Sequence, residues 1–263
     1  MSKIAILGCG WLGFPLAHQL VQSGFLVNGS TTSPAKIPVL SASGIAAFLL
    51  ELQMQAPLGD WEGFLAEVEL LVVAVPPQLR KSTSENWVDK MQLLLERVRQ
   101  SNCKKVLLIS STSVYPDHNQ VAVESDELGA TSQLVAGENL FLQADFCQTT
   151  VVRFGGLIGE DRHPVRFLAG RTQLENPVAP INLIHQADCL AILKKIIAAP
   201  FQKQVYNAVA PHHPTRVEYY TQKAREFQLP LPEFDYSKPS VGKTVSSEKL
   251  QKTLGYTFIH PEL

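Results

Sequence analysis

The stretch IAILGCGWLG, residues 4–13, decides the fold of this chain. Its first four residues are an apolar run of strand length, and the residues from Trp11 to Ser23 follow an apolar pattern that predicts a helix. Between strand and helix stand three glycines in the spacing Gly-x-Gly-x-x-Gly, at Gly8, Gly10 and Gly13. Because glycine has no side chain, the backbone of this turn is open to close approach by another group.

Glycines at this spacing have separate physical tasks. The first permits a tight turn, the second lets a pyrophosphate approach the backbone, and the third lets helix and strand pack closely. The helix N-terminus then offers oriented N–H donors to the phosphates. We predict that a dinucleotide binds at Gly8, Gly10, Trp11, Leu12 and Gly13, and a tight turn without a ligand is the alternative.

Further apolar runs alternate with helical patterns through the first half of the chain. Because these runs are apolar almost throughout, we expect strands buried on both faces of a mostly parallel sheet. The predicted strands are Ile4–Leu7, Phe25–Thr31, Ala46–Leu50, Glu69–Val75, Lys104–Ser110 and Thr149–Phe154. Their alternation with helices predicts an α/β fold of the Rossmann type, with a doubly wound parallel sheet.

Prolines gather and the elements become short after about residue 156. This change predicts two domains. Residues 1–155 form a dinucleotide-binding Rossmann domain, and residues 156–263 form a smaller C-terminal substrate lobe that is partly interleaved with the sheet.

The end of the second predicted strand bears on which dinucleotide binds. NAD sites usually place Asp or Glu about 20 residues after the glycine loop, to hold ribose hydroxyls. Here no acid occurs before Glu51, and the segment offers hydroxyl groups and an ammonium group instead. These groups suit a 2′-phosphate, so we predict NADP(H) over NAD(H), held by Thr31, Thr32, Ser33 and Lys36. Ser33 can also cap a short helix that begins at the following proline.

Composition and charge exclude several classes of function. The chain has 263 residues and a net charge of −1, so it carries no basic field for nucleic acid or an anionic membrane. No apolar run reaches the roughly 20 residues that span a bilayer, and no signal peptide is evident. Four widely spaced cysteines without a Cys-x-x-Cys pair predict reduced thiols and a cytoplasmic protein. His212 and His213 have no other ligand at metal spacing, so we predict no metal site.

Seven sequence blocks resemble the extended short-chain dehydrogenases/reductases, in the NAD-dependent epimerase/dehydratase group, and especially its small, atypical members. The blocks are the glycine loop, VVAVPP at 72–77, SSTSVY at 110–115, VVRFGGLIGEDRHP at 151–164, PINLIHQAD at 180–188, VYNAVAP at 205–211 and GKTVSSEKLQKTLGY at 242–256. The resemblance implies a Rossmann sheet with a C-terminal lobe that binds a small-molecule substrate. It also implies a homodimer paired through helices at Ser84–Gln100 and Leu134–Asp145.

The same resemblance assigns further residues. The cofactor would lie along Val75, Pro76, Pro77 and Ser110, and Ser111 would hydrogen-bond a substrate hydroxyl or carbonyl. A hydroxyl at the end of a central strand can orient a carbonyl beside a nicotinamide. The alternative is that this Ser/Thr run bonds the strand-end backbone. Two glycines, at 155 and 156, occupy a place where longer relatives often carry a substrate-contacting asparagine, which disfavours a nucleotide sugar.

The family's proton donor is a tyrosine with a lysine four residues later, and residues 130–141 contain neither type. Aligning this stretch puts Leu134 at the tyrosine and Glu138 at the lysine, so phenol acid/base work is lost there. Tyr115 is our catalytic candidate beside Ser111. Without a nearby cation its pKa should stay near roughly 10, and the ring can instead pack under the following loop.

Arg162 and His185 are the candidate substrate-binding residues. Arg162, in GEDRHP, can contact an anionic substrate, and His185 follows an apolar strand of the substrate lobe. A lone histidine at the edge of an element is more often a satisfied structural group, and this interpretation stays open for His185.

Two functions of different class follow. The first is an NAD(P)-binding, epimerase/dehydratase-like oxidoreductase that acts on a small carbonyl or sugar-like substrate without the usual Tyr/Lys pair. The second is a non-catalytic NAD(P)H-binding sensor or regulatory protein, which the loss of that pair favours. The intact glycine loop argues against a third, a scaffold that binds neither nucleotide.

Overall fold

The chain, described by a computed structural model over residues 2–53, 58–76 and 86–262, forms two compact units. Unit 1 comprises Met1–Ser110, Gly129–Val152 and Leu190–Val205. Unit 2 comprises Ser111–Leu128, Arg153–Cys189 and Tyr206–Leu263. A compact unit is not by itself an independently folding domain, so the predicted division into residues 1–155 and 156–263 stays a prediction.

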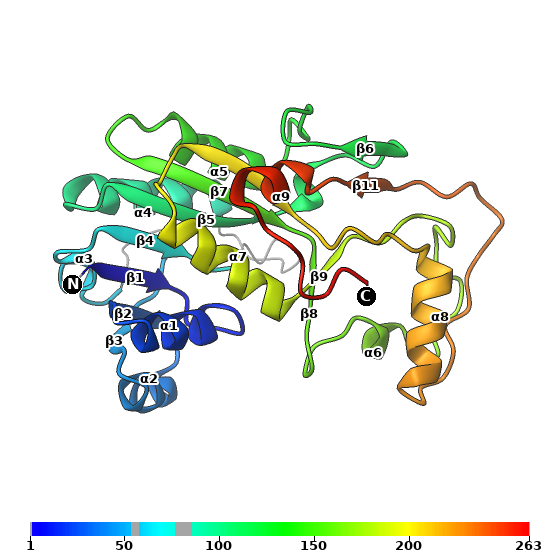
Figure 1. Cartoon of the computed structure of the whole chain (residues 1–263), viewed down its shortest axis with the longest axis horizontal. Helices are drawn as coiled ribbons and strands as arrows, with labels where there is room; N and C mark the ends of the chain where they lie inside the picture. Colours follow the sequence, from blue (N-terminus) through cyan, green and yellow to red (C-terminus); the bar gives the residue numbers. More distant parts are fainter. Residues whose placement is uncertain (1, 54–57, 77–85, 263) are drawn as a thin grey trace. The chain divides into compact units, whose positions relative to one another are not determined.

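The described residues form a parallel sheet of seven strands, most of whose residues belong to unit 1 (Figure 1). Its spatial order is β10-β7-β5-β4-β1-β2-β3. The strands are β1 (Lys3–Leu7), β2 (Leu26–Thr31), β3 (Ala46–Leu49), β4 (Leu70–Val73), β5 (Lys105–Ser111), β7 (Gln148–Phe154) and β10 (Gln204–Ala208). The strand order reverses between β1 and β4, which makes this the topological switch point of a doubly wound fold. The predicted Rossmann-type fold is confirmed.

Six of these strands match the sequence-based prediction closely. β4 is shorter than the predicted strand Glu69–Val75, because the chain leaves the ladder after Val73. Ala74 still donates its N–H to the Leu7 carbonyl over 2.8 Å, so the end of β4 stays beside the glycine loop. The seventh strand, β10, was not predicted, since its alternating polar residues lie in the proline-rich half of the chain.

Five helices and one 3-10 turn of unit 1 connect its described strands. They are α1 (Gly13–Gln22), η1 (Pro34–Lys36), α2 (Ile37–Ala42), α3 (Trp61–Leu65), α4 (Trp87–Gln100) and α5 (Gln133–Gln143). The predicted helix at Ser84–Gln100 is described from Asn86, whose Oδ1 accepts from the Val88 N–H over 2.9 Å. Ser84 itself lies outside the described residues. A sixth helix, α7 (Gln186–Ala198), has residues in both units.

Helices α4 and α5 lie side by side in unit 1 (Figure 1). Gly137 of α5 makes this approach close, since an added Cβ there would lie 2.9 Å from Nε1 of Trp87 on α4. The next residue, Glu138, is only 1% exposed. The packing of α5 therefore holds a carboxyl group inside unit 1.

Unit 2 contains two small parallel sheets among its described residues. One pairs β6 (Gln120–Ala122) with β11 (Lys243–Val245), and the other pairs β8 (Gly156–Ile158) with β9 (Leu183–His185). Its remaining elements are η2 (Thr112–Val114), α6 (Val165–Leu168), α8 (Arg216–Glu226) and α9 (Glu248–Leu254). Side chains of β8, β9, α6 and α8 share one hydrophobic core, so this unit has a core of its own.

Candidate functional site

The three loop glycines are required by three different environments. Gly8 has φ +98°, and an added Cβ would lie 2.9 Å from Cγ1 of Val75. At Gly13 the Cβ would lie 2.1 Å from the backbone oxygen of Gly8. At Gly10 it would meet nothing within 4 Å. The first and third glycines therefore serve close packing, and the second faces open space.

The loop is fixed to the end of β2 through Ser30. The Gly8 N–H donates to Ser30 Oγ over 2.9 Å, and the Cys9 N–H donates to the Ser30 carbonyl over 2.7 Å. The sequence analysis did not single out Ser30. The signal that could have identified Ser30 is its position. Ser30 follows Gly29, and Gly29 pairs with Ile6 of β1, two residues before Gly8. A hydroxyl there lies within reach of the loop N–H groups.

The N-terminus of α1 has the properties that an anion requires. The helix begins at Gly13 with Leu12 as N-cap, no side chain caps it, and no acidic residue stands in its first turn. Its N–H groups and partial positive charge therefore favour a negatively charged group. With Gly10 exposed directly beside this helix end, the residues fit the diphosphate of a dinucleotide.

The residues predicted to select NADP(H) follow β2. Thr31 is buried and its Oγ1 accepts from the Ser33 N–H over 3.1 Å, whereas Thr32 and Lys36 are exposed. Burial raises the pKa of the Cys9 thiol to about 12, and the Lys36 charge opposes part of that rise. The Lys36 charge therefore influences the Cys9 thiol in the loop. Cys9 stays protonated and serves to pack the loop.

The predicted cofactor residues on the other side of β1 lie at the ends of β4 and β5. Val75 is half-buried against Gly8, and Pro76 is exposed, while Pro77 lies outside the described residues. Ser110 is half-buried near the end of β5, and its hydroxyl donates to Oε1 of Glu138 over 2.5 Å. The structure thus places Ser110 and a buried carboxyl in the same unit as the glycine loop.

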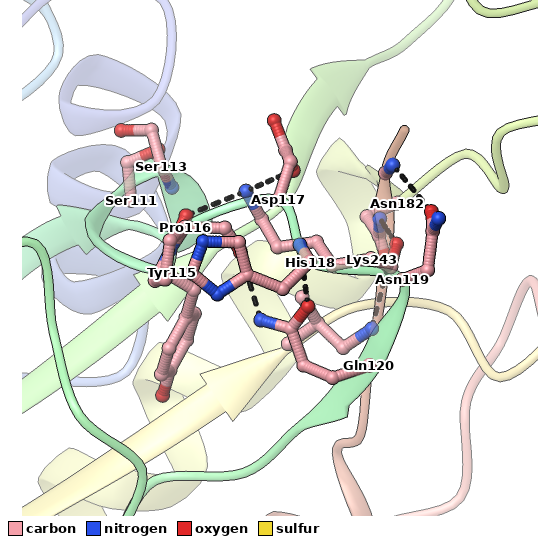
Figure 2. Close-up of polar contacts among 12 residues, drawn as sticks. Ser111, Ser113, Tyr115, Pro116, Asp117, His118, Asn119, Gln120, Asn182 and Lys243 are labelled. Atoms are coloured by element: carbon pink, nitrogen blue, oxygen red, sulfur yellow. Dashed lines mark hydrogen bonds and ion pairs between the residues drawn. The ribbon is translucent and has the colours of Figure 1, made fainter. Parts of the chain in front are cut away.

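Ser111 and Tyr115 do not point toward one another. Figure 2 shows the Ser111 side chain and the Tyr115 ring directed to opposite sides of the segment that joins them. Ser111 Oγ accepts from the Ser113 N–H over 3.2 Å at the start of η2. This bond to the backbone is the alternative given above for the Ser/Thr run. The Ser111 side chain is only partly buried, so a ligand can still contact it.

The Tyr115 hydroxyl is held inside unit 2. It accepts from Arg153 Nη1 over 2.7 Å and donates to Asn207 Oδ1 over 2.8 Å, and the residue is 2% exposed. The expectation that no cation lies nearby was wrong, because Arg153 is one. Burial nevertheless outweighs that cation and raises the pKa of Tyr115. The catalytic role of Tyr115 stays a prediction, and this geometry favours a structural one.

Lys243 ties the segment after Tyr115 to β11. Its Nζ donates to the Tyr115 carbonyl and to Asp117 Oδ1, both over 2.8 Å (Figure 2). The Lys243 carbonyl in turn accepts from Asn182 Nδ2 over 2.8 Å. These bonds fix the backbone that carries the SSTSVY block within unit 2.

Arg162 and His185 lie near one end of the β8–β9 sheet. Ile158 pairs with His185, and Arg162 is exposed in the turn that follows Ile158. The His185 ring lies 3.9 Å from the ring of His260, and its Nδ1 accepts from the Ala187 N–H. Burial and the His260 charge lower the pKa of His185, which favours a neutral imidazole.

Metal-binding groups and membrane-spanning helices are both absent among the described residues. These residues contain no group of three or more His, Cys, Asp or Glu that could hold a metal ion. None of their helices combines the length and apolar character needed to cross a membrane. Cys9, Cys103, Cys147 and Cys189 are all free and buried.

Comparison with known proteins finds a family model and a relative that match this sequence. The model of the family described as NADP oxidoreductase coenzyme F420-dependent matches residues 3–98. Protein YeeZ of Escherichia coli K12 is 30% identical over 268 residues, covering 100% of this chain and 97% of that protein.

Two solved structures share the fold at lower identity. MoeE5 in complex with UDP-glucuronic acid and NAD has a TM-score of 0.78 at 18% identity, covering 98% of this chain and 94% of that one. UDP-N-acetylglucosamine 4-epimerase from Bacillus cereus has a TM-score of 0.75 at 17% identity, covering 98% and 91%. The chain has an NAD(P)-binding, epimerase/dehydratase-like fold.

Two alanine substitutions separate the packing task of the loop from its binding task. We expect Gly13→Ala to destabilise the protein by about 1–3 kcal/mol, because its Cβ would lie 2.1 Å from a backbone oxygen. We expect Gly10→Ala to change stability by less than about 1 kcal/mol and to weaken dinucleotide binding at least about tenfold, because a methyl group would occupy the open approach. Urea denaturation and calorimetric titration measure the two effects. Unchanged binding in folded Gly10→Ala would contradict this assignment.

Proposed function

Since this chain belongs to the extended short-chain dehydrogenase/reductase family, in its NAD-dependent epimerase/dehydratase group, we propose that it is an NAD(P)-dependent oxidoreductase or epimerase. Its substrate is a small carbonyl or sugar-like molecule. The observation that carries the proposal is the glycine loop, with Gly10 open at the uncapped N-terminus of α1. A turn built only for packing has no need of the second glycine, which is exposed.

In this proposal the residues of the chain bind the dinucleotide and orient the substrate. Amides of the loop and of α1 hold the diphosphate, and Thr32 and Lys36 contact a 2′-phosphate. Ser111 orients the substrate oxygen by hydrogen bonding. The bound nicotinamide supplies hydride chemistry.

Packing around Gly155 and Gly156 supports a compact substrate. An added Cβ at Gly155 would lie 2.6 Å from the Asn182 carbonyl oxygen, and one at Gly156 would lie 2.6 Å from Leu183 Cδ2. At Gly155 the near atom belongs to the backbone, so a longer side chain has no room there, whereas at Gly156 the end of the Leu183 side chain would have to shift. The contact that an asparagine makes in nucleotide-sugar enzymes is therefore not available here, which favours a smaller substrate than those named for the solved relatives.

A non-catalytic NAD(P)H sensor is the second candidate. It is favoured by α5, where no tyrosine or lysine occurs, and by the enclosed hydroxyl of Tyr115. Such a protein would bind the dinucleotide without turning it over. Turnover therefore separates the two candidates, and binding alone does not.

Cofactor preference tests the proposed role of the segment after β2. We expect wild type to bind NADPH more tightly than NADH, and Lys36→Ala to weaken NADPH about 3- to 10-fold with little change for NADH, because one ammonium–phosphate contact is lost. Lys104→Ala is the matched control, since Lys104 is exposed at the opposite end of β5. Calorimetric titration at one fixed salt concentration measures each Kd. Tighter binding of NADH would refute the preference.

Turnover is tested with the bound dinucleotide and a broad panel of small aldehydes, ketones and sugars. We expect slow oxidation of NADPH with at least one of them, and Ser111→Ala to lower kcat/KM about 10- to 100-fold by loss of substrate orientation. Absorbance at the nicotinamide band measures the rate. Tight binding with no turnover across the panel would favour the sensor.

A homodimer paired through α4 and α5 also belongs to the proposal. Leu93 and Leu95 of α4, together with Leu140 and Phe146, line a hollow on this surface of unit 1. We expect light scattering to give twice the chain mass at micromolar concentration, and Leu140→Arg to shift the protein toward monomer by burying a charge in the contact. A wild-type monomer would overturn the dimer.

A further inference from the structure

A glutamate lies buried beneath the end of the central strand β5. Glu138 of α5 is 1% exposed and accepts from Ser110 Oγ over 2.5 Å. It shares the buried face of α5 with Leu134 and Phe141, at the spacing i, i+4 and i+7. A carboxyl group on such a face costs free energy relative to an apolar side chain of similar size.

The strand order assigns this pair to one half of the dinucleotide crevice. Leu7, Val73 and Leu108 lie in register across β1, β4 and β5, and Ser110 is two residues beyond Leu108. Neighbouring strands are about 4.8 Å apart, so the end of β5 lies roughly 10 Å across the sheet from the glycine loop. The two mononucleotide halves bind on opposite sides of the switch point between β1 and β4. The β2 side holds the adenosine half, so Ser110 and Glu138 belong to the nicotinamide half.

The hydrogen bond also determines whether the Ser110 hydroxyl can donate to a ligand or accept from it. Its hydrogen is committed to Glu138, so the lone pairs of Oγ are left to accept from a ligand. Ser110 is half-buried and Glu138 is enclosed, so of the two it is the serine that a ligand can contact. The ribose hydroxyls and the carboxamide N–H groups of a nicotinamide nucleotide are donors of the right kind.

We propose that the charge of Glu138 selects the oxidised form of the dinucleotide, while Ser110 contacts the nucleotide in either form. The oxidised nicotinamide ring is a cation and the reduced ring is neutral, so a carboxylate beneath this half of the crevice stabilises the oxidised form in particular. This inference rests on the proposed nucleotide binding and deepens it. A site that favours the oxidised form suits a reaction that begins by removing hydride from an alcohol, as an epimerase does, rather than a simple reductase. Glu138 is a positioning and selectivity residue, and Ser110 makes the contact.

The test is the ratio of two dissociation constants, Kd of the reduced form over Kd of the oxidised form, for whichever dinucleotide binds more tightly. We expect Glu138→Gln to lower this ratio about 5- to 30-fold, since it removes the charge and keeps an oxygen that accepts from Ser110. Ser110→Ala should weaken both forms alike and leave the ratio within about threefold of wild type. Glu96→Gln, an exposed change of the same net charge on α4, should leave both constants unchanged.

Each outcome separates this inference from the function on which it rests. If wild type binds neither form, the proposed function fails and the inference falls with it. If wild type binds and Glu138→Gln weakens both forms equally, Glu138 is merely structural and only the inference is overturned. Should Glu138→Gln fail to fold by circular dichroism, the wild-type ratio decides the question. A ratio above about threefold supports the inference, and a ratio of about threefold or less overturns it.

Discussion

The approach of Gly13 to the carbonyl oxygen of Gly8 is the contact on which the rest of unit 1 depends. A single Cβ at Gly13 would lie 2.1 Å from that oxygen, so the helix can begin this close to β1 only because the side chain is a hydrogen atom. The close approach of α1 to β1 has two effects. It directs the first N–H groups of α1 toward the crevice, and it brings Val75 at the end of β4 against the same loop. One steric constraint thus sets how closely the proposed phosphate site lies to the end of β1.

Charge is distributed unevenly about that loop. Lys36 stands after β2, at the edge of the crevice proposed for the 2′-phosphate, and Glu138 lies under the end of β5. An oxidised dinucleotide phosphate has its excess negative charge at the adenosine end and a positive ring at the other end. The two proposals together therefore describe a site whose polarity opposes that of its ligand. Neither residue alone would fix the direction in which the ligand lies.

The sequence predicted the sheet well because buried parallel strands are apolar along their whole length. This holds for the runs that became β1, β4 and β5, and it fails for β10, whose polar residues alternate with apolar ones. The glycine loop was predictable for a related reason, since its spacing encodes local geometry. The separation of Ser111 from Tyr115 was not, because it depends on η2 turning the chain and on Arg153 and Asn207, which are distant in sequence. Glu138 carried a readable signal, as an acid on the apolar face of a helix, but its partner Ser110 becomes visible only in the folded structure.

The identity of Glu138 also bears on whether the family's chemistry was lost or replaced. A lysine four residues after a tyrosine lowers the pKa of the phenol, whereas a carboxylate at the same position would raise it. Tyrosine and glutamate would thus work against one another there, and the chain has Leu134 in the tyrosine position. The loss of the tyrosine at Leu134 and the replacement of the lysine by Glu138 are therefore consistent with one another. A scaffold that had merely lost its reaction would gain from an apolar residue at 138, because burying a carboxyl group is costly even when it accepts a hydrogen bond. The carboxyl group is instead enclosed and bonded to a serine at the strand end, which is the arrangement expected where a charge is kept for its effect on a ligand.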